Sequence, residues 1–168
     1  MRMNIVLHQP EIPANTGNIG RTCVAVGAVL HLIEPIGFRL TGKELRRAGM
    51  DYWEHLDVRR YINFEEFVEK NIANNSKATI WMATTKAQKI YTEAVFGKND
   101  FIMFGRESAG IPEEILVNYK DTCIRIPMLE TIRSLNLSNS VGIVLYEALR
   151  QQGFEGMQTE GELHHTTW

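Results

Sequence analysis

Short apolar runs alternate along this chain with longer segments in which apolar residues recur at helical spacing. The runs of strand length lie at residues 4–7, 30–33, 79–83, 101–104 and 123–126, with a weaker one at 56–60. The segments of helical periodicity lie at residues 16–27, 42–49, 64–72, 112–119 and 137–152. Because strands and helices alternate, the pattern predicts an α/β fold with a mostly parallel sheet flanked by helices.

The most regular helical pattern is in the segment 137–152. Its apolar residues recur at i, i+3, i+4, i+7 and i+8, which places them on one buried face. They are Val141, Val144, Leu145, Ala148 and Leu149. Gly153 follows at the position where a glycine commonly ends a helix. Tyr146 lies at the edge of the buried face, so its side chain can face a site.

The first helical segment has a similar but shorter apolar face. Ile19, Cys23 and Val26 are spaced i, i+4 and i+7, which leaves Arg21 off the buried side of the helix. Either Asn15 or Thr16, at the start of this segment, is expected to cap the helix N-terminus. Arg21 therefore joins Tyr146 as a polar side chain that can face a site.

Composition narrows the class of protein. The chain has 168 residues, of which 44% are hydrophobic and 23% charged, as expected for one soluble domain with a sizeable core. We place that domain at residues 1–153, and the stretch 154–168 is a candidate mobile tail. The two cysteines lie far apart without metal-ligand spacing, and no apolar run reaches the length of a signal peptide or a membrane span. We expect a cytoplasmic protein with reduced cysteines and no metal site.

The formal net charge of −2 counts against nucleic-acid binding, which depends on Lys and Arg. The distribution of the charges changes this picture, because the acidic residues gather away from one basic cluster. That cluster contains Arg39, Lys43, Arg46 and Arg47. It is consistent either with a phosphate-binding patch or with a solvated helix face.

Three polar segments are the chemical candidates, because ligands of open parallel sheets bind at the carboxyl ends of the strands. They are residues 15–21, 104–112 and 126–140. The second begins like a Walker loop, but Gly110 is followed by Ile111 and Pro112 instead of Lys and Ser or Thr, which excludes that mode of phosphate binding. The third has more hydroxyl and amide side chains than helix capping requires, which predicts a functional loop.

Taken together, the three segments resemble the three motifs of the SPOUT RNA methyltransferases. The matching stretches are Asn15-Thr16-Gly17-Asn18-Ile19-Gly20-Arg21, Phe104-Gly105-Arg106-Glu107-Ser108-Ala109-Gly110-Ile111-Pro112, and Ile126-Pro127-Met128 with Ser134-Leu135-Asn136-Leu137-Ser138-Asn139. Further matches at 10–13, 45–52 and 146–151 resemble the TrmL subfamily, whose members methylate the ribose 2′-hydroxyl of the wobble nucleotide, position 34, in leucine tRNAs. The resemblance extends to Gly153 and does not include the tail.

The resemblance implies an S-adenosylmethionine-dependent 2′-O-methyltransferase that acts as a homodimer on the anticodon loop of leucine tRNAs. It also implies a C-terminal trefoil knot, a feature that general topology rules treat as essentially absent. The cofactor would be held largely by backbone groups of the knotted loops. The positions that match the family's cofactor contacts are Ala83, Gly105, Ile126, Ser134 and Leu135. Family members often have Leu where this chain has Ala83, so we expect a backbone contact there without the apolar packing.

The resemblance further implies a set of catalytic positions, which are Arg21, Asn15, Ser134, Asn136 and Tyr146. Arg21 matches the family's essential arginine. Because a guanidinium keeps its proton up to a pKa above about 12, we expect Arg21 to hold phosphate and stabilise the developing alkoxide. The Asn and Ser positions match residues that orient substrate or cofactor, and Glu107 is expected to fix a loop or a dimer contact. Tyr146 is a candidate partner of Arg21, but the ordinary tyrosine pKa of about 10 makes it a poor base, so the base is left open.

The resemblance gives the basic cluster a role as well. Lys43, Arg46 and Arg47 are the candidate contacts to RNA phosphates. Tyr52 or Trp53 is placed either to stack on an extruded base or to pack in the core or a dimer interface. Two alternatives stay open for the function: methylation of another tRNA or rRNA nucleotide, and a non-catalytic module that binds RNA or cofactor.

Overall fold

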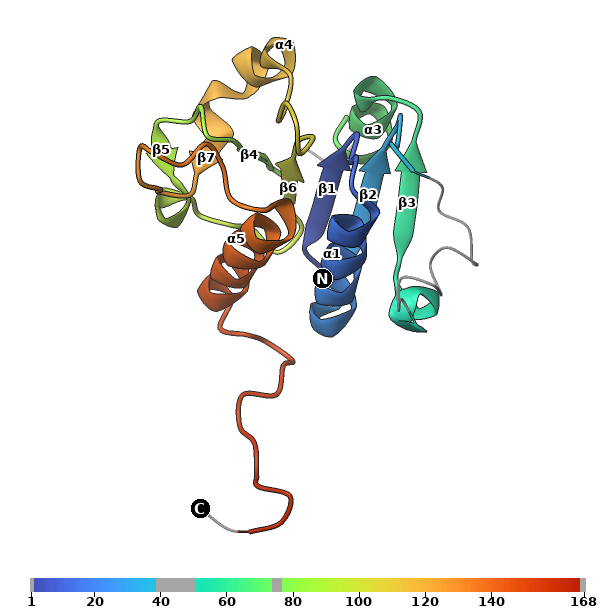
Figure 1. Ribbon diagram of the computed structural model, residues 1–168, viewed down its shortest axis with the longest axis vertical. Coiled ribbons are helices and arrows are strands. Elements are labelled where there is room, and N and C mark those ends of the chain that lie inside the picture. Colours follow the sequence, from blue (N-terminus) through green and yellow to red (C-terminus); the bar gives the residue numbers. More distant parts are fainter. Residues whose placement is uncertain (1, 39–50, 74–76, 167–168) are drawn as a thin grey trace.

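The computed structural model describes residues 2–38, 51–73 and 77–166. Within these residues, seven strands form one sheet (Figure 1): β1 (Asn4–His8), β2 (Val29–Ile33), β3 (Val58–Tyr61), β4 (Ile80–Ala83), β5 (Lys89–Ile90), β6 (Phe101–Phe104) and β7 (Cys123–Arg125). The strand order is β3-β2-β1-β6-β4-β7-β5, and every pair of neighbouring strands is parallel. The prediction of an α/β fold with a mostly parallel sheet is confirmed.

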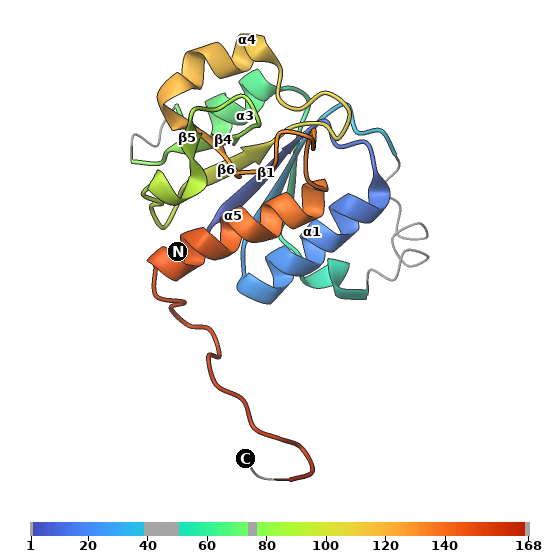
Figure 2. The same ribbon diagram turned by 60° about the vertical axis from the view of Figure 1, so that its left-hand side comes forward.

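Helices cover both faces of the sheet. The α-helices are α1 (Pro13–Val26), α3 (Phe64–Asn71), α4 (Glu113–Leu116) and α5 (Leu137–Gln151), and 3₁₀ turns occupy Asp51–His55, Tyr91–Glu93 and Val117–Thr122. Figure 2 shows α1 and α5 side by side on one face, with α3 and α4 on the other. The helix expected at residues 42–49 lies outside the described residues.

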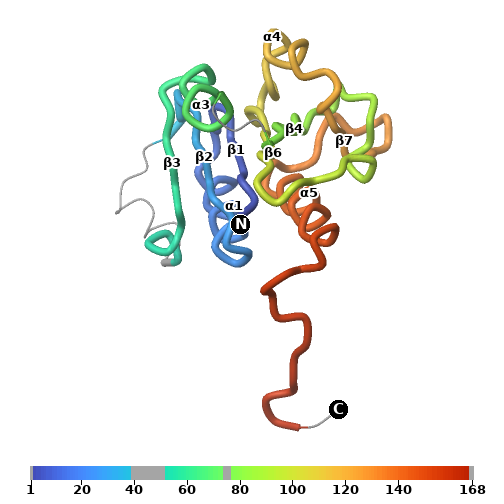
Figure 3. Tube along the Cα trace, turned by 180° about the vertical axis from the view of Figure 1, so that it is seen from behind, coloured from blue at the N-terminus to red at the C-terminus, as the bar shows by residue number. Residues whose placement is uncertain are grey.

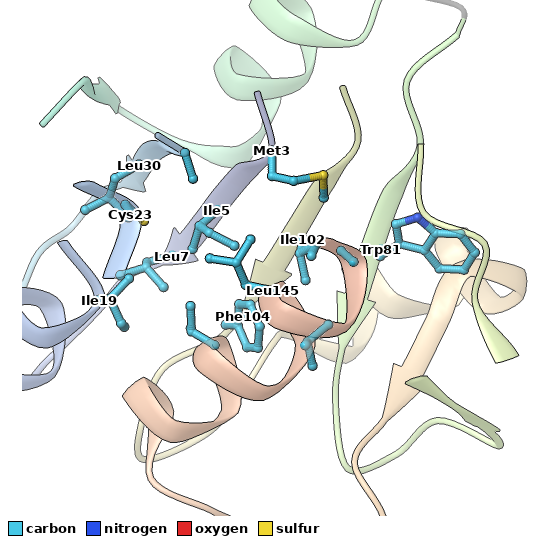
Figure 4. Close-up of a cluster of buried hydrophobic side chains, with 14 of the residues drawn as sticks. Met3, Ile5, Leu7, Ile19, Cys23, Leu30, Trp81, Ile102, Phe104 and Leu145 are labelled. Carbon is cyan, nitrogen blue, oxygen red and sulfur yellow. The ribbon is translucent and has the colours of Figure 1, made fainter. Parts of the chain in front are cut away.

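The core is divided by the sheet into two apolar clusters. Ile5 and Leu7 of β1 face the α1 and α5 side, where they pack near Leu145 (Figure 4), whereas Val6 faces the α3 side and lies in the same cluster as Phe67. This alternation follows from the two-residue period of a strand. Because both faces are covered, strands such as β6 are apolar throughout, which is typical of parallel sheets.

The two helical faces predicted from periodicity are confirmed. All five apolar residues expected on the inner side of α5 are buried, and Gly153 adopts a φ of 67° just after the helix. In α1, Ile19 and Cys23 are buried while Arg21 is exposed. The prediction that Arg21 lies off the buried face was therefore correct.

Three local predictions differ from the structure. Helix α1 begins at Pro13, and its N-cap is Ile12 without a side-chain hydrogen bond, so neither Asn15 nor Thr16 is the cap. Proline suits the first helical position because its missing N–H has no partner there anyway. The helix expected at 112–119 is shorter: α4 ends at Leu116, and the chain continues as a 3₁₀ segment in which Tyr119, with a φ of −127°, is not helical. Strand β5 has only two residues and was not predicted.

The chain ends with α5 and a long extension. The strand order, with α5 following the segment after β7, is consistent with the trefoil knot implied by the resemblance. Phe154 and Met157 pack against the cluster beneath α5, and beyond Met157 the chain leads away from the domain (Figure 3). Among the helices described, none has the length and apolar character needed to cross a membrane.

Candidate active site

A cavity of about 700 Å³ lies at the carboxyl ends of β4, β6 and β7. Its walls are the residues after β4, the loop after β6, the segment 125–136, and parts of α1 and α5. All five predicted cofactor positions line it, namely Ala83, Gly105, Ile126, Ser134 and Leu135. Asn15 and Asn136 line it as well. A cavity of this size matches the usual range for small-molecule sites.

The loop after β6 closes tightly on itself at Gly105. A Cβ placed on Gly105 would lie 1.9 Å from the carbonyl carbon of Gly110 and 2.1 Å from the nitrogen of Ile111. Two backbone hydrogen bonds between Arg106 and Gly110, of 3.2 and 2.8 Å, hold the turn, and Gly110 has a φ of 71°. Both glycines are therefore required by backbone geometry, which only glycine satisfies without strain.

The carboxylate of Glu107 closes the N-terminal end of α1 from a distant part of the chain. It accepts hydrogen bonds from the backbone N–H of Glu11 at 2.9 Å and of Ile12 at 3.2 Å, and from Asn15 Nδ2 at 3.0 Å. A negative charge at a helix N-terminus is also favoured by the helix dipole. The expectation that Glu107 fixes a loop is confirmed.

Glu11, just before α1, binds in turn to the loop after β6 that contains Glu107. Its carboxylate accepts hydrogen bonds from the backbone N–H of Ser108 at 2.9 Å and from Ser108 Oγ at 2.8 Å. These two bonds hold the pKa of the Glu11 carboxyl below its usual range. The segment before α1 and the loop after β6 thus clamp each other through two carboxylates. Sequence reasoning did not identify the role of Glu11, because its partners are distant in sequence.

The side-chain amide of Asn136 connects this clamp to α5. Asn136 Nδ2 donates to Asn15 Oδ1 at 3.0 Å, and Asn136 Oδ1 accepts from Ser138 N at 2.9 Å, which makes Asn136 the N-cap of α5. Asn15, only 6% exposed, thus donates to Glu107 and accepts from Asn136. One continuous network joins all three polar segments that the sequence singled out.

Arg21 and Tyr146 lie outside the lining of this cavity. The guanidinium carbon of Arg21 is 5.0 Å from the centre of the Tyr52 ring, and the Tyr52 hydroxyl donates to the carbonyl of Gly17 at 2.5 Å. Tyr146 is 47% exposed on the outer side of α5. Of the predicted catalytic residues, the structure thus brings together Asn15, Ser134 and Asn136.

Tyr52 and Trp53, the aromatic pair that follows the basic cluster in the sequence, both contact the rest of the domain. Trp53 packs against the core, and a Cβ on Gly20 would lie 3.1 Å from Trp53 Cζ3. This contact supports the interpretation of Trp53 as a packing residue. Lys43, Arg46 and Arg47 lie outside the described residues. In the described ranges, no group of three His, Cys, Asp or Glu side chains is placed to hold a metal ion.

Comparison with known proteins identifies the family. The family model of the SpoU rRNA Methylase family matches residues 2–146. The chain belongs to this family. The prediction of a methyltransferase is confirmed, and the cavity bounded by the three polar segments is the candidate active site of this SpoU methylase.

Three relatives of the SpoU methylase define the match further. The tRNA (cytidine(34)-2′-O)-methyltransferase of Saccharophagus degradans is 47% identical over 154 residues, covering 91% of this chain and 97% of the relative. A solved structure described as giving structural insights into the 2-OH methylation of C/U34 on tRNA has a TM-score of 0.84 and 42% identity, covering 92% of this chain and 98% of that one. An AdoMet-bound rRNA methyltransferase from Sinorhizobium meliloti has a TM-score of 0.76 and 28% identity, covering 89% of this chain and 56% of that one.

The cavity of this SpoU methylase fits S-adenosylmethionine. In the part of the chain that the structure describes, segment 126–135 belongs to no helix or strand, and a backbone hydrogen bond from Ile132 N to Leu129 O closes a turn within it. Most of this segment is exposed, so its backbone N–H and C=O groups are accessible to a ligand. Ile126, Leu137 and Val144 add an apolar wall suited to an adenine ring.

The cavity also has basic residues that sequence reasoning did not assign. Lys86 follows β4, Arg125 ends β7, and Arg133 precedes Ser134, and all three line the cavity. The rule that ligands bind at the carboxyl ends of parallel strands would have selected Lys86 and Arg125 once the strand ends were known.

Proposed function

We propose that this SpoU methylase transfers the methyl group of S-adenosylmethionine to the ribose 2′-hydroxyl of nucleotide 34 in leucine tRNAs, as a cytoplasmic homodimer. The observation that carries the proposal is the hydrogen-bonded network of Glu107, Asn15 and Asn136, which joins the three motif segments around one cavity. The names of the relatives that match nearly the whole chain support the choice of tRNA and of position 34.

The cofactor supplies an electrophilic methyl group when it is bound. Ala83, Gly105, Ile126, Ser134 and Leu135 would hold it, mainly through backbone groups. Gly105 keeps the loop after β6 closed, which fixes one wall of the cavity. Holding the reactants in alignment can provide a large part of the rate acceleration of a group transfer.

Asn15 and Asn136 act as positioning residues in this proposal. Each uses its amide to tie one wall of the cavity to the next. Ser134 also lines the cavity, and in this proposal its hydroxyl would orient the cofactor or the ribose. Their role is to keep the reacting atoms in register, not to exchange protons.

Arg21 would act on the cavity of the second protomer. It is six residues after Asn15 on α1, about 9 Å along the helix axis, and it does not line the cavity of its own chain. The exposed side chains of Ile143 and Tyr146 on α5 support an interface between copies on this side of the molecule. In such a dimer, Arg21 would hold phosphate and stabilise the developing alkoxide.

The first experiment measures transfer of labelled methyl from S-adenosylmethionine to tRNA that lacks the modification, followed by nuclease mapping of the methylated nucleotide. We expect 2′-O-methylation at position 34 of leucine tRNAs, lost in Arg21→Ala and kept in Arg60→Ala, a matched arginine on β3. Methylation at another tRNA or rRNA nucleotide would keep the enzyme class and reject the substrate. Cofactor binding without transfer to any RNA would favour the non-catalytic module.

Mixing two inactive variants tests the role of the dimer. If Arg21 of one protomer serves the cavity of the other, Arg21→Ala combined with Asn136→Ala should regain activity after the subunits exchange, because a mixed dimer retains one intact site. Activity that stays absent in the exchanged mixture, with mixed dimers present, would place Arg21 in its own cavity.

Lys43, Arg46 and Arg47 remain proposed contacts to tRNA phosphates. Arg46→Ala should weaken tRNA binding and lower its salt dependence while cofactor affinity stays unchanged. An unchanged salt slope would remove Arg46 from the interface.

A further inference from the structure

The lining of the cavity is strongly basic although the whole chain has a net charge of −2. Its charged residues are the cations Lys86, Arg106, Arg125 and Arg133 and a single acid, Glu107. The Glu107 carboxylate already accepts three hydrogen bonds from the segment around α1. Lys86 Nζ lies 3.1 Å from Glu113 Oε1, so its charge is balanced. The three arginines therefore account for the excess positive charge.

These arginines differ from others on the surface. Arg2, Arg59, Arg60 and Arg150 each form an ion pair with Asp or Glu. Over the described ranges, no ion pair or side-chain hydrogen bond involves Arg106, Arg125 or Arg133, and the buried Nε of Arg106 has no partner. Arg106 lies close enough to Glu11 to help lower the pKa of that carboxyl, which leaves Arg125 and Arg133 as cations of the lining whose charge no neighbouring carboxylate of the described chain offsets. Like charges at one site repel each other, so this pair favours the binding of an anion.

The cofactor does not supply that anion. S-adenosylmethionine has a positive sulfonium, a positive ammonium and one carboxylate, so its net charge is positive. A purely cofactor-binding cavity would gain from acidic residues, whereas this one has arginines. A ligand with several negative charges must therefore share the cavity with the cofactor.

The positions of Arg125 and Arg133 indicate which part of the cavity this anionic ligand would occupy. Arg125 directly precedes Ile126, and Arg133 directly precedes Ser134. Each is thus adjacent in sequence to a proposed cofactor contact, about 3.8 Å away between Cα atoms. Arg133 is exposed and Arg125 half-buried, so both are accessible to a large ligand. Arginine suits this role because its planar guanidinium can bind a phosphate with two parallel hydrogen bonds.

We infer that Arg125 and Arg133 bind backbone phosphates of the substrate RNA that flank the target ribose. This inference rests on the proposed function and adds a phosphate-binding site inside the cavity, formed by residues other than those of the basic cluster at 39–47 in the sequence. Two phosphates held on either side of one ribose would fix the strand so that its 2′-hydroxyl points at the cofactor, which is the alignment that methyl transfer needs.

The test compares Arg125→Ala and Arg133→Ala with the wild type. We expect the KM for tRNA to rise roughly tenfold in each variant, and the slope of log affinity against log salt to decrease by about 0.7 for each lost phosphate contact. Cofactor affinity, measured by calorimetry, should stay the same or increase slightly, because a cation next to a cationic ligand is removed. Arg133→Lys keeps the charge and should retain most of the salt slope, and Arg60→Ala should behave as wild type.

Two results would overturn the inference. An unchanged KM and salt slope in both alanine variants would remove these arginines from the RNA site. A loss of cofactor affinity with unchanged tRNA binding would assign them to the carboxylate of the cofactor. If an alanine variant loses thermal stability, Arg125→Gln and Arg133→Gln, which keep the aliphatic stem, take its place. If the wild type methylates no tRNA, the proposed function fails, and that result is distinct from wild-type activity that these variants leave unaltered.

Discussion

The side-chain amide of Asn136 donates a hydrogen bond of 3.0 Å to the side-chain oxygen of Asn15, 121 positions earlier in the chain. Asn15 is buried at the start of α1, and Asn136 caps α5, so this bond fixes the ends of two helices that pack side by side (Figure 2). The relative position of α1 and α5 at the cavity therefore depends on the hydrogen bond between the side-chain amides of Asn15 and Asn136.

Two substitutions at Asn136 separate its two roles. Asn136→Ala removes the cap of α5 and should lower the free energy of unfolding by about 1 kcal/mol or more, together with activity. Asn136→Asp keeps an N-cap acceptor but replaces the amide donor by a carboxylate facing Asn15 Oδ1. We therefore expect near-normal stability with reduced methyl transfer, measured by thermal unfolding and a transfer assay. Equal activity in Asn136→Asp and wild type would show that the bond to Asn15 does not matter for catalysis.

Glu107→Gln tests the clamp at the start of α1. Glutamine offers one acceptor oxygen, and its NH₂ group would face either a backbone N–H or the Asn15 amide. The free energy of unfolding should fall by about 1–2 kcal/mol, because hydrogen bonds to a charged group are lost. Urea unfolding measures this change. The matched variant Glu54→Gln, at an exposed glutamate, should unfold like the wild type.

Gly105→Ala should abolish cofactor binding, because the new methyl group would lie 1.9 Å from the backbone of Gly110 and force the loop open. Gly142, inside α5, provides the control, since in the described chain no atom beyond its chain neighbours and the nearby backbone of its own helix lies within 4 Å of a Cβ built there. Gly142→Ala should stabilise the protein by about 0.5–1 kcal/mol. Calorimetric binding of S-adenosylmethionine and a melting curve check both. Normal cofactor affinity in Gly105→Ala would mean that the loop is not a wall of the binding site.

Stability should fall as the pH drops below about 6.5, because His31 is buried in its neutral form. The Asn4 amide group donates to backbone carbonyls, so its oxygen accepts from His31 Nε2, while the Tyr61 hydroxyl lies 2.8 Å from Nδ1. Burial, with a smaller effect of Arg59, lowers the pKa of His31 to about 3.

The unfolded chain binds this proton at a pKa of about 6.5 and the folded chain does not, so protonation favours unfolding between these two values. The loss should reach about 2 kcal/mol at pH 5. Burial and Arg106 also lower the pKa of His8, which acts in the same direction. Urea unfolding at pH 7 and pH 5 measures the difference. It should shrink in His31→Phe and persist in His55→Gln, and an equal pH dependence in all three would exclude His31 as a cause.

The sequence predicted those features of the fold that depend on neighbouring residues. Strand β6 was located to the residue, because four apolar side chains are bounded by Asp100 and Gly105. The inner face of α5 followed from its period. By contrast, α1 begins earlier than expected: it starts at Pro13 without a side-chain cap, and the two residues before it are held by hydrogen bonds to the distant Glu107 carboxylate.

The candidate site was located by resemblance more than by local pattern. The five cofactor positions do line one cavity, but the bond between Asn15 and Asn136 joins residues whose proximity no local rule predicts. The basic lining was missed for the same reason: Arg125 and Arg133 become neighbours of the same cavity only after β7 is placed beside β4. Two-residue strands such as β5 are too short for a periodic signal.

The cavity takes one wall from the N-terminal part of the chain and another from residues near its end. During synthesis, these two walls of the cavity cannot come together until Asn136 and the start of α5 have left the ribosomal exit tunnel. The strands up to β6 can pair before Asn136 is available, but the hydrogen bond between Asn15 and Asn136 can form only afterwards. The complete cavity therefore forms only late in synthesis, and a polypeptide that stops short of α5 could form the earlier strands but would lack one wall of the cavity.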